Sequence, residues 1–438
     1  MDSRPEQQAT SVSIAAYLRL LRANRNFRRL WAAQIVSEIG DWFYSLSIYS
    51  LLLQLTGKPS SVALALVLQV LPQTFTGPTA GVLNDRVRRR QVMITADVAR
   101  VVIVLCMLFV RTRSMVWLVY PLLLLETIMA AFFEPARNSV IPNIVTRDDL
   151  IVANTLSATT WSLNLAIGAT LGGVVAALLG RNAVFVLNAL SFLASALLIS
   201  GMRFVEPHAE HGQPFRVREL VDFSPIRDGV RYIASDLRLL ATVCAKSGIG
   251  FLGAGWVYFT VMGAQLFPIT GGGMSAQRGA MLSISLLWGS RGVGALIGPL
   301  YAASWAGRQE RRLRTGILIG FLMGAVGYLL LGKAPSLWVA CALVIFAHCG
   351  TSTVWVFSST LLQLNTDDRF RGRVFSADFG LCMLVIAVAG YVAGVLLDAG
   401  VSVRLLASAT GACMILPFVI WAFALRLWKD QPQTVVRG

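Results

Sequence analysis

The chain has 438 residues, of which 56% are hydrophobic and only 14% charged, and its mean hydropathy is +0.66. Soluble domains carry about 25% charged residues, so this composition excludes a string of soluble globular domains and predicts a protein embedded in lipid. The net charge of +16 does not indicate a nucleic-acid partner, because 28 of the 38 basic residues fall on one side of the predicted membrane topology, 7 on the other and 3 within helices, which is the positive-inside pattern.

Twelve stretches of the chain are long and apolar enough to cross a bilayer, for which a helix needs about 20 residues. Eight of them contain no charged residue: 59–84, 150–180, 182–202, 247–277, 315–332, 334–366, 379–397 and 405–425. Four more are interrupted by charge: 30–56, 91–110, 115–137 and 279–305. We therefore predict an all-α membrane protein of twelve transmembrane helices, with both termini in the cytoplasm.

The one long connection between helices divides the chain into two six-helix bundles. The predicted segments are a cytoplasmic N-terminal segment (1–29), a first bundle (30–202), a cytoplasmic central loop (203–238), a second bundle (239–427) and a cytoplasmic tail (428–438). Within the central loop, Ile226, Val230 and Ile233 recur at helical spacing among arginines. This pattern predicts an amphipathic helix on the cytoplasmic membrane surface.

Predicted helix 1 carries a polar stripe at membrane depth. The stripe has i, i+4, i+7 and i+11 spacing, which places its members on one helical face: Gln34, Glu38, Asp41 and Ser45. Asp41 lies roughly 16 Å into a hydrocarbon core of about 30 Å, where a carboxylate needs a partner, a cavity or a proton. We expect the stripe to line a central cavity in which Glu38 and Asp41 handle protons. Gln34, Ser45 and the neighbouring Trp42 are predicted substrate contacts.

Other charged residues are also predicted at membrane depth. Glu126 in helix 4 is a third candidate for proton coupling, whereas Lys246 and Arg291 place positive charge in the second bundle. Acids of one bundle that face bases of the other would bind an anionic or zwitterionic substrate, or would form a gate that breaks during transport. The structural alternative is a permanent ion pair between Glu38 or Asp41 and one of these bases.

Charged residues at the cytoplasmic ends of helices 2, 3 and 11 are predicted to form a conformational latch. Asp97 and Arg100 are i, i+3 neighbours and are expected to pair. Asp378 is expected to make the equivalent arrangement in the second half with Arg371 and Arg373. The predicted latch residues are Gly81, Asp85, Arg86, Arg90, Asp97, Arg100, Arg371, Arg373 and Asp378.

The two halves of the chain show an internal repeat. Residues 146–149 before helix 5 match residues 365–368 before helix 11 at an offset of 219, which is half of 438, and Ser157 and Ser376 keep the same register. Transporters are often built from such repeats, with the substrate site between them near the bilayer midplane.

Glycines at helical spacing predict close contacts between helices. They are Gly168, Gly172 and Gly173 in helix 5, and Gly294 and Gly298 in helix 8. Small residues four apart let helix backbones approach in lipid, so tight packing alone explains them.

Several segments resemble motifs of a known family. Residues 81–90 resemble the signature loop of the major facilitator superfamily. In both, a glycine is followed by three residues, then by Asp-Arg and then by a basic cluster. Residues 26–31, 134–137 and 371–374 are similar to segments of its branch of macrolide-efflux and siderophore (enterobactin) exporters. The helix 5 glycines are similar to a motif of the family's antiporters.

This resemblance implies the major facilitator fold and a secondary active transporter in the bacterial cytoplasmic membrane. We expect it to export an amphipathic small molecule, such as a drug, siderophore or secondary metabolite, by proton antiport with alternating access. Lysophospholipid flipping or nutrient symport is the alternative. A membrane enzyme or sensor is least favoured, because no metal-ligand spacing or nucleophile motif appears. The expected partners are the substrate, protons and membrane lipids, with no cofactor or metal and a monomeric state.

Overall fold

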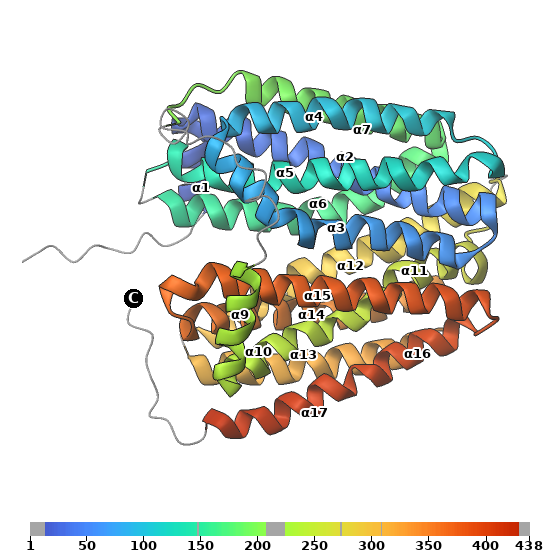
Figure 1. Cartoon of the computed structure of the whole chain (residues 1–438). Helices are drawn as coiled ribbons and strands as arrows, with labels where there is room; N and C mark the ends of the chain where they lie inside the picture. Colours follow the sequence, from blue (N-terminus) through green and yellow to red (C-terminus); the bar gives the residue numbers. More distant parts are fainter. Residues whose placement is uncertain (1–13, 147–148, 207–223, 272–273, 308, 429–438) are drawn as a thin grey trace, which may run out of the picture.

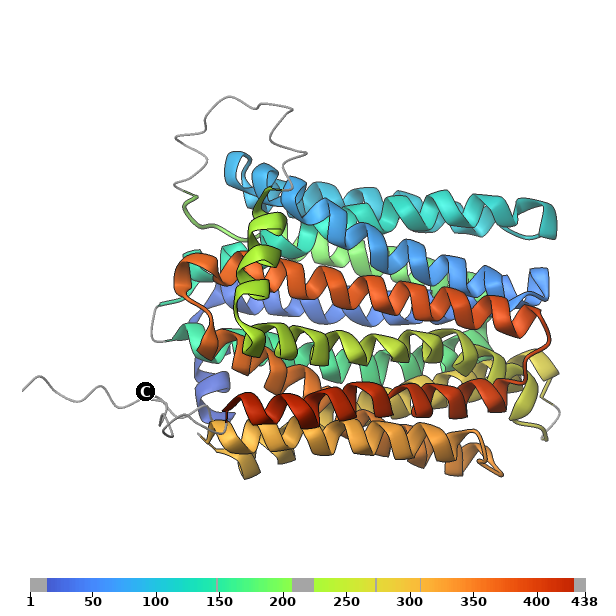
Figure 2. The same ribbon diagram turned by 60° about the horizontal axis from the view of Figure 1, so that its bottom comes forward.

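The computed structural model describes residues 14–146, 149–206, 224–271, 274–307 and 309–428. Within these ranges every regular element is helical, and the long helices run side by side in two groups (Figure 1). A second view shows the same arrangement (Figure 2). We call the end of the molecule at which α2 begins the near end, and the end at which α2 stops the far end.

The first bundle is built from helices that alternate in direction between the near and far ends. It consists of α2 (Arg25–Thr56), α3 (Pro59–Arg86), α4 (Arg89–Cys106), α5 (Val119–Ile144), α6 (Leu150–Leu179) and α7 (Arg181–Ser200), with the short helices α1 (Ile14–Ala23), η1 (Met107–Phe109) and η2 (Arg113–Leu118). Asn24 caps the start of α2 by accepting a hydrogen bond from Phe27 N at 2.9 Å. Gly57, at φ 68°, ends α2 in the left-handed conformation that favours glycine.

The second bundle repeats this up-and-down path. It consists of α10 (Leu237–Gly248), η5 (Ile249–Leu252), α11 (Gly253–Val261), η6 (Met262–Leu266), α12 (Ala276–Ala306), α13 (Glu310–Leu331), α14 (Leu337–Asn365), α15 (Asp368–Asp398), α16 (Val403–Cys413), α17 (Ile415–Ala424) and η7 (Leu425–Trp428). The path from α10 to η6 is one discontinuous crossing. It bends where Gly253 approaches α15 so closely that a Cβ would overlap the carbonyl of Ile386.

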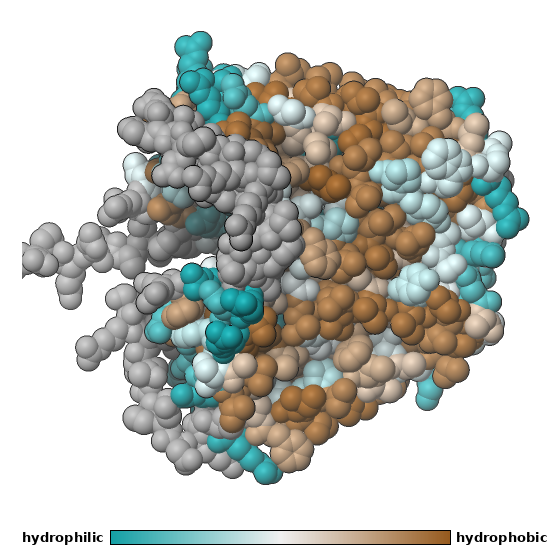
Figure 3. Space-filling view, viewed as in Figure 1, coloured by the Kyte–Doolittle hydropathy of each residue, from teal (hydrophilic) through white to brown (hydrophobic). Residues whose placement is uncertain are grey.

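The molecule has the surface of a membrane protein. Ten of the described helical segments are long and apolar enough to cross a bilayer, and α2 and α3 run beside them as the remaining pair (Figure 1). Polar residues such as Gln34 and Glu38 make α2 less apolar than its neighbours. The visible surface carries a hydrophobic band with hydrophilic residues at its two ends (Figure 3). Lipid-exposed side chains such as Leu178 and Leu405 therefore need no protein partner. The fold confirms the predicted all-α transporter architecture.

The two bundles contact each other through small residues. A Cβ on Gly292 of α12 would overlap the Ala166 backbone of α6, and one on Gly394 of α15 would overlap Ala63 of α3. At the far end, Gln277 Nε2 of α12 donates to Gln54 Oε1 of α2 at 3.1 Å. Between these points, Gly173 of α6 faces Ser285 of α12.

The helix predicted in the central loop is α9 (Ser224–Ser235). It crosses the near end of α15 in both ribbon views (Figure 1, Figure 2). Tyr232 stacks on Phe370 with ring centroids 4.4 Å apart, and Ile233 is buried. Part of its apolar face therefore packs on the second bundle, whereas Val230 is 54% exposed. The predicted helix is present, and its location on the membrane surface stays a prediction. The side chain of Ile226 lies outside the described residues.

Candidate functional site

Glu38 of α2 is held by three hydrogen bonds inside the first bundle. Its Oε1 accepts from Gln34 Nε2 at 2.9 Å and from Arg137 Nη1 at 3.0 Å. Its Oε2 accepts from Asn164 Nδ2 at 2.8 Å, and Arg137 also pairs with Glu134 at 2.7 Å. The side chains of Glu38, Gln34, Arg137 and Asn164 form one buried hydrogen-bond network. The charge on Glu38 is therefore stabilised in place by both an opposite charge and hydrogen bonds.

Asp41, near the middle of α2, is bound much more loosely. Its Oδ2 lies 3.9 Å from Arg100 Nη1, and 36% of its side-chain surface is accessible. Its Oδ1 is enclosed and has no hydrogen-bond partner. Arg100 is engaged elsewhere, because it pairs with Asp97 at 2.5 Å and lies over the rings of Phe133 and Phe192, 4.7 Å and 4.2 Å from their centroids. The predicted pairing of Asp97 with Arg100 is confirmed.

Glu126 of α5 is the third acid near Arg100. It is buried and makes no hydrogen bond or ion pair with the described part of the chain, yet it lies within electrostatic range of Asp41 and Arg100. Asp41, Asp97 and Glu126 thus share one guanidinium. Two negative charges would lack a counter-ion at membrane depth unless protons neutralised them.

Lys246 of α10 is paired within its own bundle. Its Nζ donates to Asp378 Oδ2 of α15 at 2.5 Å and to Ser359 Oγ of α14 at 3.0 Å, and it lies 4.3 Å from the ring centroid of Trp355. Lys246 therefore does not face the acids of the first bundle, and the expected permanent pair of Glu38 or Asp41 with Lys246 or Arg291 is wrong.

The pairing predicted for Asp378 is also wrong. Asp378 is fully buried against α10, whereas Arg373 lies on the surface and pairs with Asp228 of α9 at 3.4 Å. Arg371 is exposed and makes an interaction elsewhere. The rotation of α15 turns Asp378 inward and the two arginines outward, so they do not meet.

Arg291 lies at the middle of α12 and has no acidic partner. Its guanidinium carbon lies 4.4 Å from the ring centroid of Trp256 and 5.1 Å from that of Trp288. Its Nη1 is enclosed without a hydrogen bond, and Arg291 forms no ion pair with the described residues. Nearby, Tyr328 and His348 share a hydrogen bond of 2.7 Å.

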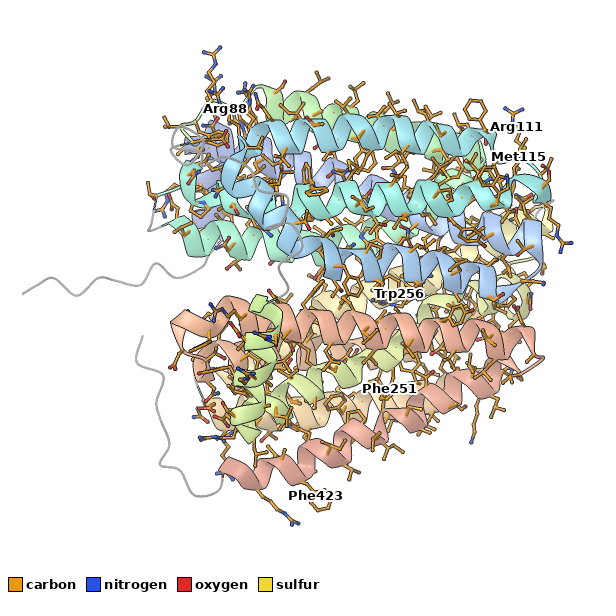
Figure 4. All side chains as sticks on the ribbon, viewed as in Figure 1. Arg88, Arg111, Met115, Phe251, Trp256 and Phe423 are labelled. Atoms are coloured by element: carbon orange, nitrogen blue, oxygen red, sulfur yellow. The ribbon has the colours of Figure 1, made fainter. Side chains whose placement is uncertain are left out.

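A row of aromatic rings crosses from the first bundle to the second. Trp161 contacts Trp42 at 6.2 Å, Trp42 contacts Trp288 at 6.0 Å, and Trp288 contacts Trp256 at 5.3 Å between ring centroids. Trp256 lies between the two groups of helices (Figure 4). Trp161 is 46% exposed whereas Trp288 is fully buried. The accessible rings of this row, those of Trp42, Trp161 and Trp256, offer flat apolar surface to a ligand, and the buried Trp288 joins them.

Two of the predicted substrate contacts take part in hydrogen bonds within the first bundle. Gln34 also donates to Ser157 O at 3.1 Å, and Ser45 Oγ accepts from Gln69 Nε2 at 3.4 Å. Gln69 in turn accepts a hydrogen bond from Tyr49. Ser45, Gln69 and Tyr49 therefore form a polar wall next to Trp288, which lies 6.1 Å from the Tyr49 ring.

The predicted latch residues are only partly described. The side chains of Gly81, Asp85 and Arg86 lie outside the described residues. Arg90 donates to the carbonyls of Ile199, at 3.3 Å, and Ser200. It therefore ties the start of α4 to the end of α7 within one bundle.

The predicted glycines lie at close helix contacts. Gly168 and Gly172 lie against α2, Gly173 faces Ser285 of α12, and Gly294 and Gly298 lie against α14. A Cβ at Gly172 would come within 2.9 Å of the Phe43 backbone. Of these five, only Gly173 faces the other bundle.

The sequence reasoning did not single out several members of these networks. Glu134 and Arg137 carried a usable signal, because an acid and a base at i, i+3 spacing share one helix face. Asn164, Ser359 and Gln69 carried none, since an uncharged polar residue in an apolar helix does not identify its partner.

The whole-chain comparisons agree with this geometry. The family model described as Major Facilitator Superfamily matches residues 30–378. Macrolide efflux protein A of Streptococcus pyogenes is 25% identical over 368 residues, covering 83% of this chain and 87% of that protein. The proposed bacilysin exporter BacE of Bacillus subtilis is 26% identical over 328 residues, covering 72% of this chain and 75% of that protein.

A solved structure has the same fold. A bacterial homolog of the human lysosomal transporter Spinster, in an inward-facing and occupied conformation, superposes with a TM-score of 0.68 at 14% identity, covering 91% of this chain and 96% of that one. At this identity the similarity concerns the fold alone.

Proposed function

The chain belongs to the major facilitator superfamily, and on that premise we propose that it exports an amphipathic small molecule in exchange for protons. The family and its efflux-type relatives make it a multi-pass membrane transporter and not an enzyme. The observation that carries the proton-coupling proposal is the Asp41 carboxyl, loosely bound at the middle of α2.

Proton coupling requires a carboxyl group that changes its protonation state at low cost. Protonating Glu38 would weaken hydrogen bonds from Gln34, Arg137 and Asn164, and hydrogen bonds to a charged group contribute about 1.5–3 kcal/mol each. Asp41 has no hydrogen bond to the described residues that protonation would weaken, and Arg100 keeps Asp97 as its partner when Asp41 is neutral. We therefore assign proton exchange to Asp41, with Glu126 as its neighbour and Glu38 as a structural acid.

Alternating access is part of this proposal and is supported by the glycines between the bundles. Gly173 of α6 and Gly292 of α12 lie in the contact of these two helices, and Gly390 and Gly394 of α15 lie against α3. Helices in contact through glycines can slide and rock with little steric resistance. We place the near end in the cytoplasm of a bacterial cell, because the basic residues concentrate there, so that substrate enters between the bundles from the cytoplasm.

The proposed substrate is amphipathic. The row from Trp161 to Trp256 offers ring faces, whereas Ser45, Gln69 and Tyr49 offer hydrogen bonds beside it. Two relatives are named for efflux of macrolides and for export of bacilysin, which supports export of a secondary metabolite or drug. Trp42, which touches rings on both sides, is the proposed centre of the site.

The test combines a proton measurement, which needs no knowledge of the substrate, with a transport assay of the cargo class for which one relative is named. Infrared difference spectra of the purified protein, recorded as the pH is stepped, are expected to contain a carboxyl band that disappears in Asp41→Asn. In proteoliposomes loaded with a radiolabelled macrolide, an imposed pH gradient is expected to accelerate transport, and Asp41→Asn is expected to lower that acceleration at least about tenfold.

Glu310→Gln is the matched control, because Glu310 lies in the first turn of α13 at the near end, away from the Asp41 cluster. It is expected to keep both the carboxyl band and the acceleration. Coupling through Asp41 would be refuted if Asp41→Asn behaved like this control. Acceleration by a gradient of the opposite sign would indicate symport.

A further inference from the structure

Arg291 differs from the other basic residues buried in the helices. Arg100, Arg137 and Lys246 each pair with an acid at 3.0 Å or less. Arg291 makes no hydrogen bond or ion pair with the described part of the chain, and its Nη1 is enclosed. A guanidinium has five N–H donors, so this site leaves an unusually large donor capacity unused at the middle of α12.

The aromatic rings around Arg291 stabilise its positive charge but do not accept hydrogen bonds from its N–H groups. The rings of Trp256 and Trp288 lie 4.4 Å and 5.1 Å from the guanidinium carbon, and such contacts stabilise a cation through the ring faces. Ring faces do not accept the in-plane N–H groups, which therefore remain available to an anionic oxygen.

Among the described residues, no acid is placed to take that position, and Glu126 lies near Arg100 rather than Arg291. Glu38 is fully hydrogen-bonded within the first bundle, and Asp41 lies beside Arg100 of the same bundle. In the second bundle, the buried Asp378 forms an ion pair with Lys246. Neutralisation of Arg291 by a group of this chain would require one of these networks to break.

We propose that Arg291 binds an anionic oxygen group of the transported molecule, so that the substrate class is an organic anion with a flat apolar body. The anionic oxygen group accepts hydrogen bonds from the guanidinium, and the ring system lies along the partly exposed Trp256 and Trp42. Both parts of the molecule are then bound at the middle of the membrane, where the two bundles meet. This inference names a substrate class for the proposed function. It rests on that function, because only a transporter would carry the bound anion as its substrate.

The test compares an acid with its uncharged isostere. The full-length protein in lipid nanodiscs is titrated calorimetrically with 1-naphthaleneacetate and with 1-naphthaleneacetamide, and empty nanodiscs give the lipid background. Charge-assisted hydrogen bonds contribute about 1.5–3 kcal/mol, so the acid is expected to bind about 10- to 100-fold more tightly than the amide. In Arg291→Gln this preference is expected to fall to about twofold or less, with the affinity for the amide unchanged.

Two further variants complete the design. Arg278→Gln is the matched control, because Arg278 is an exposed arginine at the far end of the same helix, and it is expected to keep the wild-type preference. Arg291→Lys retains the charge without the planar fork and is expected to recover part of the preference. Size-exclusion chromatography establishes that each variant is folded.

The assignment of Arg291 would be overturned by equal affinities for acid and amide in the wild type, by no binding of either compound, or by a preference that survives in Arg291→Gln. Proton exchange at Asp41 is read from the infrared band without any anion. An intact band together with a failed anion preference would therefore refute the substrate class and leave proton coupling standing.

Discussion

The buried pair of Lys246 and Asp378 gives the sharpest prediction for stability. Lys246 Nζ lies 2.5 Å from Asp378 Oδ2, and Asp378 is fully buried with its other oxygen unpaired. Lys246→Met would leave a carboxylate in a low-dielectric interior without a counter-ion. Removing one partner of a buried pair costs about 3–5 kcal/mol, so the free energy of unfolding is expected to fall by that amount.

The double variant Lys246→Met/Asp378→Leu removes both charges, and so it distinguishes the cost of one unpaired charge from the contribution of the ion pair. Replacing both charges by apolar side chains is often neutral or stabilising by about 1–4 kcal/mol, so the double variant is expected to be more stable than the single one. Stability is measured by reversible unfolding with dodecyl sulfate in mixed micelles, followed by circular dichroism. Arg373→Met is the control, because its exposed pair with Asp228 contributes only about 0–1 kcal/mol. Wild-type stability in Lys246→Met, or a double variant weaker than the single one, would refute the reasoning.

Two other predictions concern the first bundle and its contact with the second. Glu38→Gln keeps the shape of the side chain but removes the charge that Arg137 pairs with at 3.0 Å, so the free energy of unfolding is expected to fall by about 1.5–3 kcal/mol in the same titration; no loss would mean that this network contributes nothing. Gly292→Ala places a Cβ against the Ala166 backbone, so spin labels on α6 and α12 are expected to report a greater separation. Gly372→Ala, which meets no atom within 4 Å, should leave the separation unchanged, and equal spectra for both variants would contradict the proposed contact.

Local spacing predicted contacts within one helix correctly. Gln34 and Glu38, at i, i+4, share a hydrogen bond of 2.9 Å, and Asp97 and Arg100, at i, i+3, form an ion pair of 2.5 Å. The geometry of an α-helix alone brings such side chains together.

Spacing failed where the partner lies on another helix. Asp378 was expected to meet Arg371 and Arg373 of its own helix, but it pairs with Lys246 of α10, 132 residues away in the chain. Arg137 of α5 reaches Glu38 of α2 across 99 residues. Such partners depend on how far each helix is rotated about its axis when it packs, and the order of residues within one helix contains no such information.

The amino-acid sequence by itself predicted the twelve-helix architecture, because the length of an apolar run and the bias of basic residues act locally on each segment. The family was indicated separately, by the resemblance of short motifs. It also identified Asp41 and Arg291 as charges at membrane depth. Only the tertiary structure decided that Glu38 is saturated by three donors while Asp41 is not, and that Lys246 has an acid while Arg291 has only ring faces. The physical reason is that the cost of a buried charge is set by its neighbours, and those neighbours come from other helices.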